Sequence, residues 1–346
     1  MYYSGNKKFS SKLDAIIHFN KTKENTFFYY YDEVYDKLNW RMEPPGTLDF
    51  YYREQAQRIR DNYDYVILCF SGGADSTNIL ETFHYNKIKL DKVITVGAFS
   101  QDSHSMVEEN HNGEIYFVAH PYLRELGLES ITQHIDYTKY FDNFGQFSVN
   151  QYGNEWSDVL ASWYSPHNFF WRDLHKFVVP KNMENKRVAI IFGQDKATLE
   201  VHKSGALGFK FADCNMQAYG TIQSKDNCDI IQFYHDPQFP LIAIKQTHIL
   251  KKAYDIKKTI AKDKNRGVQI ISGISVNELI YNLKKPITYV TPKSRTVFLS
   301  IRDEYIENKK DSDVYNFYLS GIKHLSDKIG GLDKYMVFFS KFYRIE

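Results

Sequence analysis

The sequence is poor in cysteine and in excess charge, and both shortages limit what the protein can be. Its 346 residues include three cysteines, Cys69, Cys214 and Cys228, which form no CxxC pair and are too few for a disulfide framework. This indicates a reducing, intracellular setting. Forty-four Lys and Arg against 42 Asp and Glu leave a formal net charge of +2, so the sequence lacks the basic excess that marks nucleic-acid-binding proteins.

Long apolar runs are missing as well. The longest, such as Val66–Phe70 and Val188–Phe192, have the length of strands, whereas a membrane helix needs roughly 18 residues or more. No run of signal-peptide length stands at the N-terminus. We therefore expect a cytoplasmic protein without membrane partners, in the host cytoplasm if the source is viral. Aromatic residues, in contrast, are abundant: 25 Phe, 27 Tyr and 4 Trp require a folded core and exclude disorder of the whole chain.

The order of the apolar patterns predicts an α/β fold. We expect a doubly wound, mostly parallel, Rossmann-like sheet in residues 63–212, an N-terminal appendage in residues 1–62, and a mixed, largely helical C-terminal extension in residues 213–346 that packs over the active site. Because the predicted strands alternate with helices, the ligand site should lie beyond the carboxyl ends of the strands. The predicted strands are Tyr65–Phe70, Lys92–Val96, Ser130–Asp136 and Arg187–Phe192. The predicted helices include Ser11–Asn20, Leu48–Asp61, Thr77–Tyr85 and Pro166–Val179, and we expect a further long helix within Leu241–Ala261.

The most informative feature is the turn from Ser71 to Ser76, which has the sequence Ser-Gly-Gly-Ala-Asp-Ser between a predicted strand and a predicted helix. Gly72 and Gly73 let the backbone approach a ligand without a Cβ clash, and the amides of the helix's first turn favour a phosphate. Ser71 and Ser76 can donate hydrogen bonds to its oxygens. Asp75 has the same sign of charge as phosphate, so its carboxylate suits a bridging Mg²⁺. The turn lacks the Walker lysine and the Gly-x-Gly-x-x-Gly spacing of dinucleotide-binding loops.

This turn resembles the PP-loop of the N-type ATP pyrophosphatases, the superfamily of asparagine, GMP, NAD and argininosuccinate synthetases and of tRNA thiolation enzymes. The resemblance implies ATP and Mg²⁺ as cofactors, cleavage of ATP between the α and β phosphates, and adenylation of a substrate oxygen. It also implies that Ser71, Gly72, Gly73, Asp75 and Ser76 bind the nucleotide, with Asp75 as a metal ligand.

A second segment resembles the synthetase domain of asparagine synthetases. The predicted strand at 188–192 is followed by Gly193 and Asp195, where that family has a Ser-Gly-Glu-Gly-x-Asp-Glu loop. The likeness implies that Gly193 binds the nucleotide, that Asp195 is a metal ligand, and that Val96, at the end of another strand, contacts the adenine. Lys196, which the family does not have, should emerge at the ligand edge as a catalytic cation.

The sequence also departs from asparagine synthetases. Phe192 stands where they have serine, and Tyr2 follows Met1 where the ammonia-producing enzymes begin with a cysteine nucleophile and a glutaminase domain. We therefore expect no production of ammonia from glutamine.

Uncharacterised, phage-encoded asparagine synthase-like PP-loop proteins are more similar. They share a block like Phe233–Pro240 with Lys245, Gln246 and His248 downstream. Lys245 and His248 are three residues apart and should share a helix face. Lys245 is a candidate catalytic cation for the leaving pyrophosphate; the alternative is that this is a solvated helix face.

Together these features predict an AMP-forming ligase that activates a carboxylate or amide-type oxygen for attack by an amine or ammonia. Its acceptor, small molecule or macromolecule, is not named by the sequence. Two alternatives stay open: a nucleic-acid or nucleobase-modifying enzyme of the tRNA thiolation type, for which Cys214 and Cys228 would have to act as a pair, and a non-catalytic nucleotide-binding protein.

Overall fold

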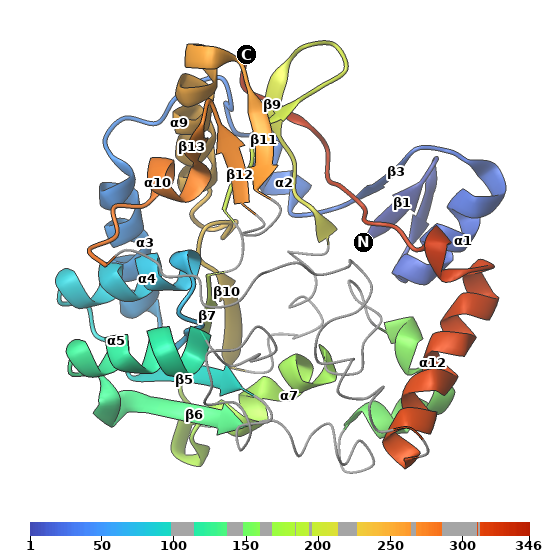
Figure 1. Cartoon of the computed structure of the whole chain (residues 1–346), viewed down its shortest axis with the longest axis horizontal. Coiled ribbons are helices and arrows are strands. Elements are labelled where there is room, and N and C mark those ends of the chain that lie inside the picture. The colour runs from blue at the N-terminus through green and yellow to red at the C-terminus, as the bar shows by residue number, and fades with distance from the viewer. Residues whose placement is uncertain are drawn as a thin grey trace.

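The centre of the protein is a five-stranded parallel sheet (Figure 1). The computed structural model describes residues 1–97, 114–136, 148–159, 168–183, 185–193, 196–213, 227–263, 268–285, 310 and 312–346. The sheet has the order β10-β7-β4-β5-β6, and each neighbouring pair is parallel. Its strands are β4 (Tyr65–Cys69), β5 (Lys92–Gly97), β6 (Thr132–Asp136), β7 (Val188–Phe192) and β10 (Cys228–Gln232).

This order confirms the predicted doubly wound α/β fold. Counted along the chain, the strands lie in the order third, second, first, fourth, fifth, so the direction of winding reverses between β4 and β7. In open α/β sheets, ligands bind beyond the carboxyl ends of the strands at such a reversal. The turn that begins at Ser71 follows β4, and Gly193 follows β7, so both segments that the sequence singles out lie at the reversal.

Alternate strand residues enter two separate cores, one on each face of the sheet. Val66 and Leu68 of β4 pack into the larger core, whereas Ile67 between them belongs to the second one. Both cores are rich in fully buried side chains, as expected for strands covered on both faces. The larger core is covered by α3 (Leu48–Asn62) and α4 (Ala74–Tyr85), and the second by α7 (Asn168–Val178), the 3-10 segment η5 (Ser148–Val159) and α12 (Asp313–Ile329).

The N-terminal appendage forms its own small antiparallel sheet, and its helix α1 (Lys12–Thr22) lies beside α12 (Figure 1). Ser11 caps the first helix by accepting a hydrogen bond from the Asp14 amide. The appendage comprises β1 (Tyr2–Ser4), β2 (Lys7–Phe9), α1 (Lys12–Thr22), β3 (Thr26–Phe28) and α2 (Asp32–Tyr35).

Between β5 and β6 the described chain is helical. It contains the π-helical turn η2 (Ile115–Ala119), α5 (His120–Glu125) and the 3-10 turn η3 (Glu129–Ile131), and a further 3-10 turn, η6 (Lys181–Met183), precedes β7.

The C-terminal region contains more strand than the sequence suggests. Cys228–Gln232 supplies β10, so the sheet continues past the predicted boundary at residue 212. The long helix predicted within Leu241–Ala261 runs from Leu241 to Lys257, and Ala261 lies in the strand that follows. The elements of this region are β8 (Glu200–Val201), β9 (Leu207–Phe209), α9 (Leu241–Lys257), β11 (Ile260–Asp263), β12 (Val268–Ile271), β13 (Ile274–Ser275), α10 (Val276–Ile280), η7 (Leu332–Lys334) and β14 (Tyr343–Arg344).

Within the described ranges, none of the helices combines the length and the apolar character needed to cross a membrane.

Candidate functional site

The turn after β4 is a tight bend that only glycine fits well. Gly72 has φ of +80°, in the left-handed region. A Cβ on this residue would lie 3.1 Å from both the Glu114 carbonyl oxygen and the Ala119 Cβ. The turn therefore packs directly against η2, just before α5 begins.

Two serine hydroxyls hold the turn in shape. The Ser76 Oγ donates to the Gly73 carbonyl oxygen at 3.1 Å and accepts from the Ser71 amide at 3.2 Å. Ser71 is exposed, so its side chain is accessible for the predicted contact with phosphate. Ser76 is buried and instead stabilises the shape of the loop. Gly73 is the N-cap of α4 and has no side chain to occupy the first amides of the helix, which suits an anion.

Gly193 lets the end of β7 approach the first turn of α4. A Cβ at this position would lie 3.0 Å from the Asp75 carbonyl carbon and 3.0 Å from the Ser76 amide nitrogen. Real Cβ atoms rarely come this close to backbone atoms. Gly193 is thus required by packing beneath the loop, in addition to the nucleotide contact that the sequence predicts.

Asp75 and Lys196, both predicted site residues, form an ion pair. The Lys196 ammonium lies 2.9 Å from Oδ1 and 3.2 Å from Oδ2 of Asp75, with 13% and 25% of the two side chains exposed. Tyr281, directly after α10, donates its hydroxyl to the same Oδ1 at 2.7 Å. Burial and the Asp75 charge raise the pKa of Tyr281 well above its usual value, so the phenol stays protonated as a donor.

Tyr281 belongs to a buried tyrosine cluster beside the loop. Its ring lies 5.6 Å from that of Tyr234, which lies 5.7 Å from that of Tyr52. The Tyr234 hydroxyl donates to the Asp75 carbonyl oxygen at 2.6 Å and accepts from the Asn78 side chain at 3.1 Å. Burial raises the pKa of Tyr234 well above its usual value. The block Phe233–Pro240, named above for its resemblance to other PP-loop proteins, thus contributes a direct contact to the loop.

Side chains from two helices position these groups. Gln246 of α9 accepts from the Ala197 amide and donates to the Tyr52 hydroxyl, both at 3.0 Å, which fixes the backbone next to Lys196. The buried Glu81 of α4 accepts from the amides of Lys284 and Lys285, at 2.8 Å and 3.3 Å, and so anchors the chain just after Tyr281. Tyr281 and Glu81 cannot be singled out from the sequence, because an isolated tyrosine after a short helix and a glutamate within a helix have no distinguishing pattern.

Lys245 has a different set of partners from the one predicted. Its ammonium lies 2.7 Å from the Glu43 carboxylate and 3.0 Å from the Pro44 carbonyl oxygen. His248 lies on the same helix face, as predicted, and its Nε2 is 2.9 Å from the Trp40 carbonyl oxygen. Both side chains are buried and bind the segment before α3, so the alternative of a solvated face is wrong too. The structure therefore does not bring Lys245 to the loop.

The remaining predicted residues are placed only in part. Val96 is partly buried near the carboxyl end of β5, the strand next to β4. Asp195 and Cys214 lie outside the described residues. Cys69 and Cys228 are free thiols whose pKa values are raised by burial, Cys228 to about 12. Among the described residues, no group of three His, Cys, Asp or Glu side chains is arranged to hold a metal ion.

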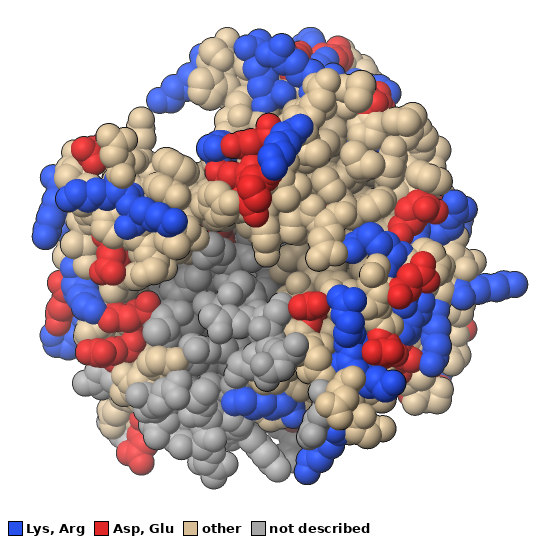
Figure 2. All heavy atoms as spheres, turned by 180° about the vertical axis from the view of Figure 1, so that it is seen from behind, with Lys and Arg blue, Asp and Glu red and all other residues tan. Residues whose placement is uncertain are grey.

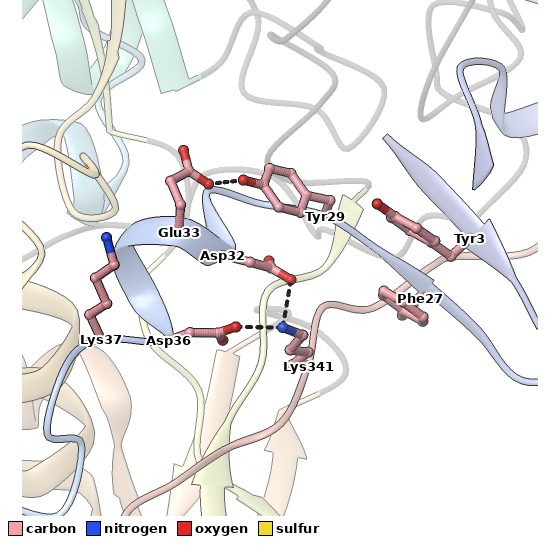
Figure 3. A pocket seen from close by; sticks show the side chains of 8 residues that line it. All are labelled: Tyr3, Phe27, Tyr29, Asp32, Glu33, Asp36, Lys37 and Lys341. Atoms are coloured by element: carbon pink, nitrogen blue, oxygen red, sulfur yellow. Dashed lines mark hydrogen bonds and ion pairs between the residues drawn. The ribbon is translucent and has the colours of Figure 1, made fainter. Parts of the chain in front are cut away.

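A shallow pocket lies elsewhere, on the N-terminal appendage (Figure 3). Tyr3 and Phe27 stack on one side of it, with ring centroids 4.5 Å apart. Its carboxylates already have partners, since Lys341 bridges Asp32 and Asp36. None of the loop residues Ser71–Ser76 lines this pocket. Its lining consists of Tyr3, Phe27, Tyr29, Asp32, Glu33, Asp36, Lys37 and Lys341.

Charged side chains of both signs are intermingled on the face shown in Figure 2. Lys and Arg do not gather there into the continuous basic stripe that tracks a nucleic-acid backbone. Together with the net charge of +2, this gives no support to the nucleic-acid alternative.

Comparison with known proteins adds no family assignment. No protein-family model matches the chain, and no curated protein is significantly similar to it.

Proposed function

We propose that the protein is an AMP-forming ATP pyrophosphatase that activates a carboxylate or amide-type oxygen for attack by an amine or ammonia. The observation that carries this proposal is the Ser-Gly-Gly-Ala-Asp-Ser turn at the reversal of the sheet, with Asp75, Lys196 and Tyr281 converging on it. A turn there, opening into the uncapped first turn of α4, suits a polyphosphate.

The residues present fit Mg–ATP. In this proposal the β and γ phosphates bind at the Ser71–Ser76 loop, and the adenine binds near Val96. Asp75, partly exposed, would hold Mg²⁺ together with Asp195, and the bound metal would supply positive charge to the leaving pyrophosphate. Carboxylate oxygens are the ligands that Mg²⁺ prefers.

Lys196 and Asp75 would then exchange partners when the nucleotide binds. In the free protein the ammonium compensates the carboxylate at 2.9 Å. If Asp75 held Mg²⁺, the Lys196 ammonium would be available to the phosphates, where a preorganised cation stabilises charge that develops in an in-line displacement. Tyr281 keeps the carboxylate oriented through its hydrogen bond to Oδ1.

The test is release of pyrophosphate from ATP and Mg²⁺, with and without a mixture of amino acids as acceptors. Wild-type protein should release it, and Asp75→Asn should abolish the Mg²⁺-dependent release while the variant keeps its fold, because Asp75 is at the loop edge of the sheet. Pyrophosphate release by Asp75→Asn at the wild-type rate would contradict the metal role. A wild-type protein that binds ATP and releases nothing would favour the non-catalytic nucleotide-binding alternative.

A further inference from the structure

Two histidines share one buried threonine hydroxyl next to the candidate site. The Oγ1 of Thr95 in β5 lies 3.0 Å from His120 Nε2 and 2.9 Å from His134 Nδ1. The two imidazole rings meet edge to face with centroids 5.1 Å apart, and Tyr116 packs against both. Thr95 is fully buried. Neither the fold nor the contacts of the loop explain why three polar side chains converge here.

This cluster adjoins the loop through the backbone. The Phe70 amide, directly before the turn, donates to the Ile94 carbonyl oxygen at 2.7 Å, directly before Thr95. On the other side, Ala119, directly before His120, is the residue that a Cβ on Gly72 would touch. Thr95 and His120 are therefore each one residue away from a group that contacts the turn or the residue directly before it.

Hydrogen-bond counting allows two opposite directions for the cluster. A threonine hydroxyl has one proton, so it can donate to one imidazole while it accepts from the other. If it accepts from the His120 Nε2–H and donates to His134 Nδ1, the His120 Nδ1 keeps a free lone pair. His134 then has its proton on Nε2, a buried atom for which the described residues provide no hydrogen-bond partner.

Burial favours the neutral form of both rings, which is the form that can accept a proton. Burial, followed by His134 and Arg124, lowers the pKa of His120. Burial also lowers the pKa of His134, against the opposing effect of Asp136. A base in this state is deprotonated at neutral pH, which a proton acceptor requires.

We propose that His120 is the general base for the nucleophile at the candidate site, with Thr95 and His134 as positioning residues that fix its tautomer. This inference rests on the proposed AMP-forming function. When an amine attacks the adenylated carbonyl, its nitrogen bonds to the carbon. The bond from that carbon to the phosphate oxygen breaks, and AMP leaves with the electron pair. The nitrogen's proton goes to Nδ1 of His120.

The chain of hydrogen bonds is tested without any turnover, by ¹⁵N NMR of the histidine rings in the full-length protein. We expect His120 as the Nε2–H tautomer and both rings titrating below the ordinary histidine range. Thr95→Val should move both titrations together, whereas Thr95→Ser, which keeps the hydroxyl, should not. Rings that titrate at ordinary values and ignore residue 95 would overturn the proposal whatever the activity.

The catalytic role is tested with ATP, Mg²⁺, a mixture of amino acids and hydroxylamine as the nucleophile. His120→Gln should lower hydroxamate formation by about 10²-fold or more and remove the acidic limb of its pH profile, while pyrophosphate from the first turnover is still released. Thr95→Val should shift the acidic limb of the pH profile, whereas Thr95→Ser should keep it where the wild type has it. His84→Gln, at the far end of α4 from the loop, is the control. Unchanged hydroxamate formation by His120→Gln would overturn the proposal, whereas absence of pyrophosphate from the wild type would instead contradict the proposed function.

Discussion

The Lys196 ammonium lies 2.9 Å from the Asp75 carboxylate, and this pair joins the segment after β7 to the first turn of α4. The pair spans the reversal of the sheet, where a ligand would bind. Neither charge is fully exposed, so each would be costly to leave without its partner. The site is therefore charge-balanced in the free protein, and a ligand that enters it has to supply replacement partners for both groups.

Lys196→Ala should lower turnover by about 10²–10³-fold while it changes ATP affinity much less, because a preorganised cation acts mainly on developing charge. Lys257 is exposed at the end of α9, and Lys257→Ala should leave the rate unchanged. Steady-state rates and ATP affinities of both variants check this. Equal losses in both would mean that Lys196 contributes only general surface charge.

Tyr281→Phe should destabilise the protein by about 1–2 kcal/mol, because the Asp75 carboxylate loses a hydrogen bond and is solvated only in part. Denaturant unfolding of the variant measures the change. Tyr3→Phe is the matched control on the appendage, where the ring stacks on Phe27, and we expect little effect there. Equal stability of Tyr281→Phe and wild type would argue that the phenol does not bind the carboxylate in solution.

Gly193→Ala should destabilise the protein by about 1–3 kcal/mol, because the added Cβ would lie 3.0 Å from backbone atoms of Asp75 and Ser76 that cannot move alone. Gly73→Ala is the comparison within the same loop. There the added Cβ would meet the Ser71 Oγ at 3.4 Å, an ordinary contact, so the steric cost should be small. Thermal unfolding of the two variants decides whether the close approach of β7 to α4 is real; similar melting temperatures would count against it.

The pairing of Glu43 with Lys245 and Lys252 predicts a pH-dependent contribution to stability. Their hydrogen bonds lower the pKa of Glu43 from 4.5 to about 2. Because the folded-state pKa is the lower one, the stabilisation is complete above 4.5 and is lost as the pH falls toward about 2. Glu43→Gln should therefore be less stable than wild type at neutral pH, and the difference should shrink over that range. A difference in unfolding free energy that does not change with pH would show that the carboxylate's charge is not involved.

The sequence was sufficient to predict the α/β fold because its signals are local. The apolar run before Ser71 and the helical spacing after Ser76 are visible in a few consecutive residues, and β4 and α4 lie where they predict. The strand at Cys228 was missed, because a short strand at the sheet edge is recognised by its pairing with β7, which no local pattern encodes.

The candidate site was predictable only where its residues adjoin strand ends. Asp75 and Lys196 were placed at one edge by their positions after β4 and β7. Tyr281 reaches the loop from more than two hundred residues away, and its place depends on how Glu81 anchors the segment that follows it. Lys245 was placed wrongly, because helix periodicity gives the face that a side chain shares and not the segment that packs against this face.

The most direct test of the central claim is the nucleotide product. The loop lacks the lysine that grips the γ-phosphate for β–γ transfer in Walker-type enzymes, so the bond that breaks should be the one between the α and β phosphates. Chromatography of ATP after incubation with the protein, Mg²⁺ and an acceptor mixture should show AMP, with pyrophosphate in equal amount. ADP as the sole product, with inorganic phosphate, would contradict the account.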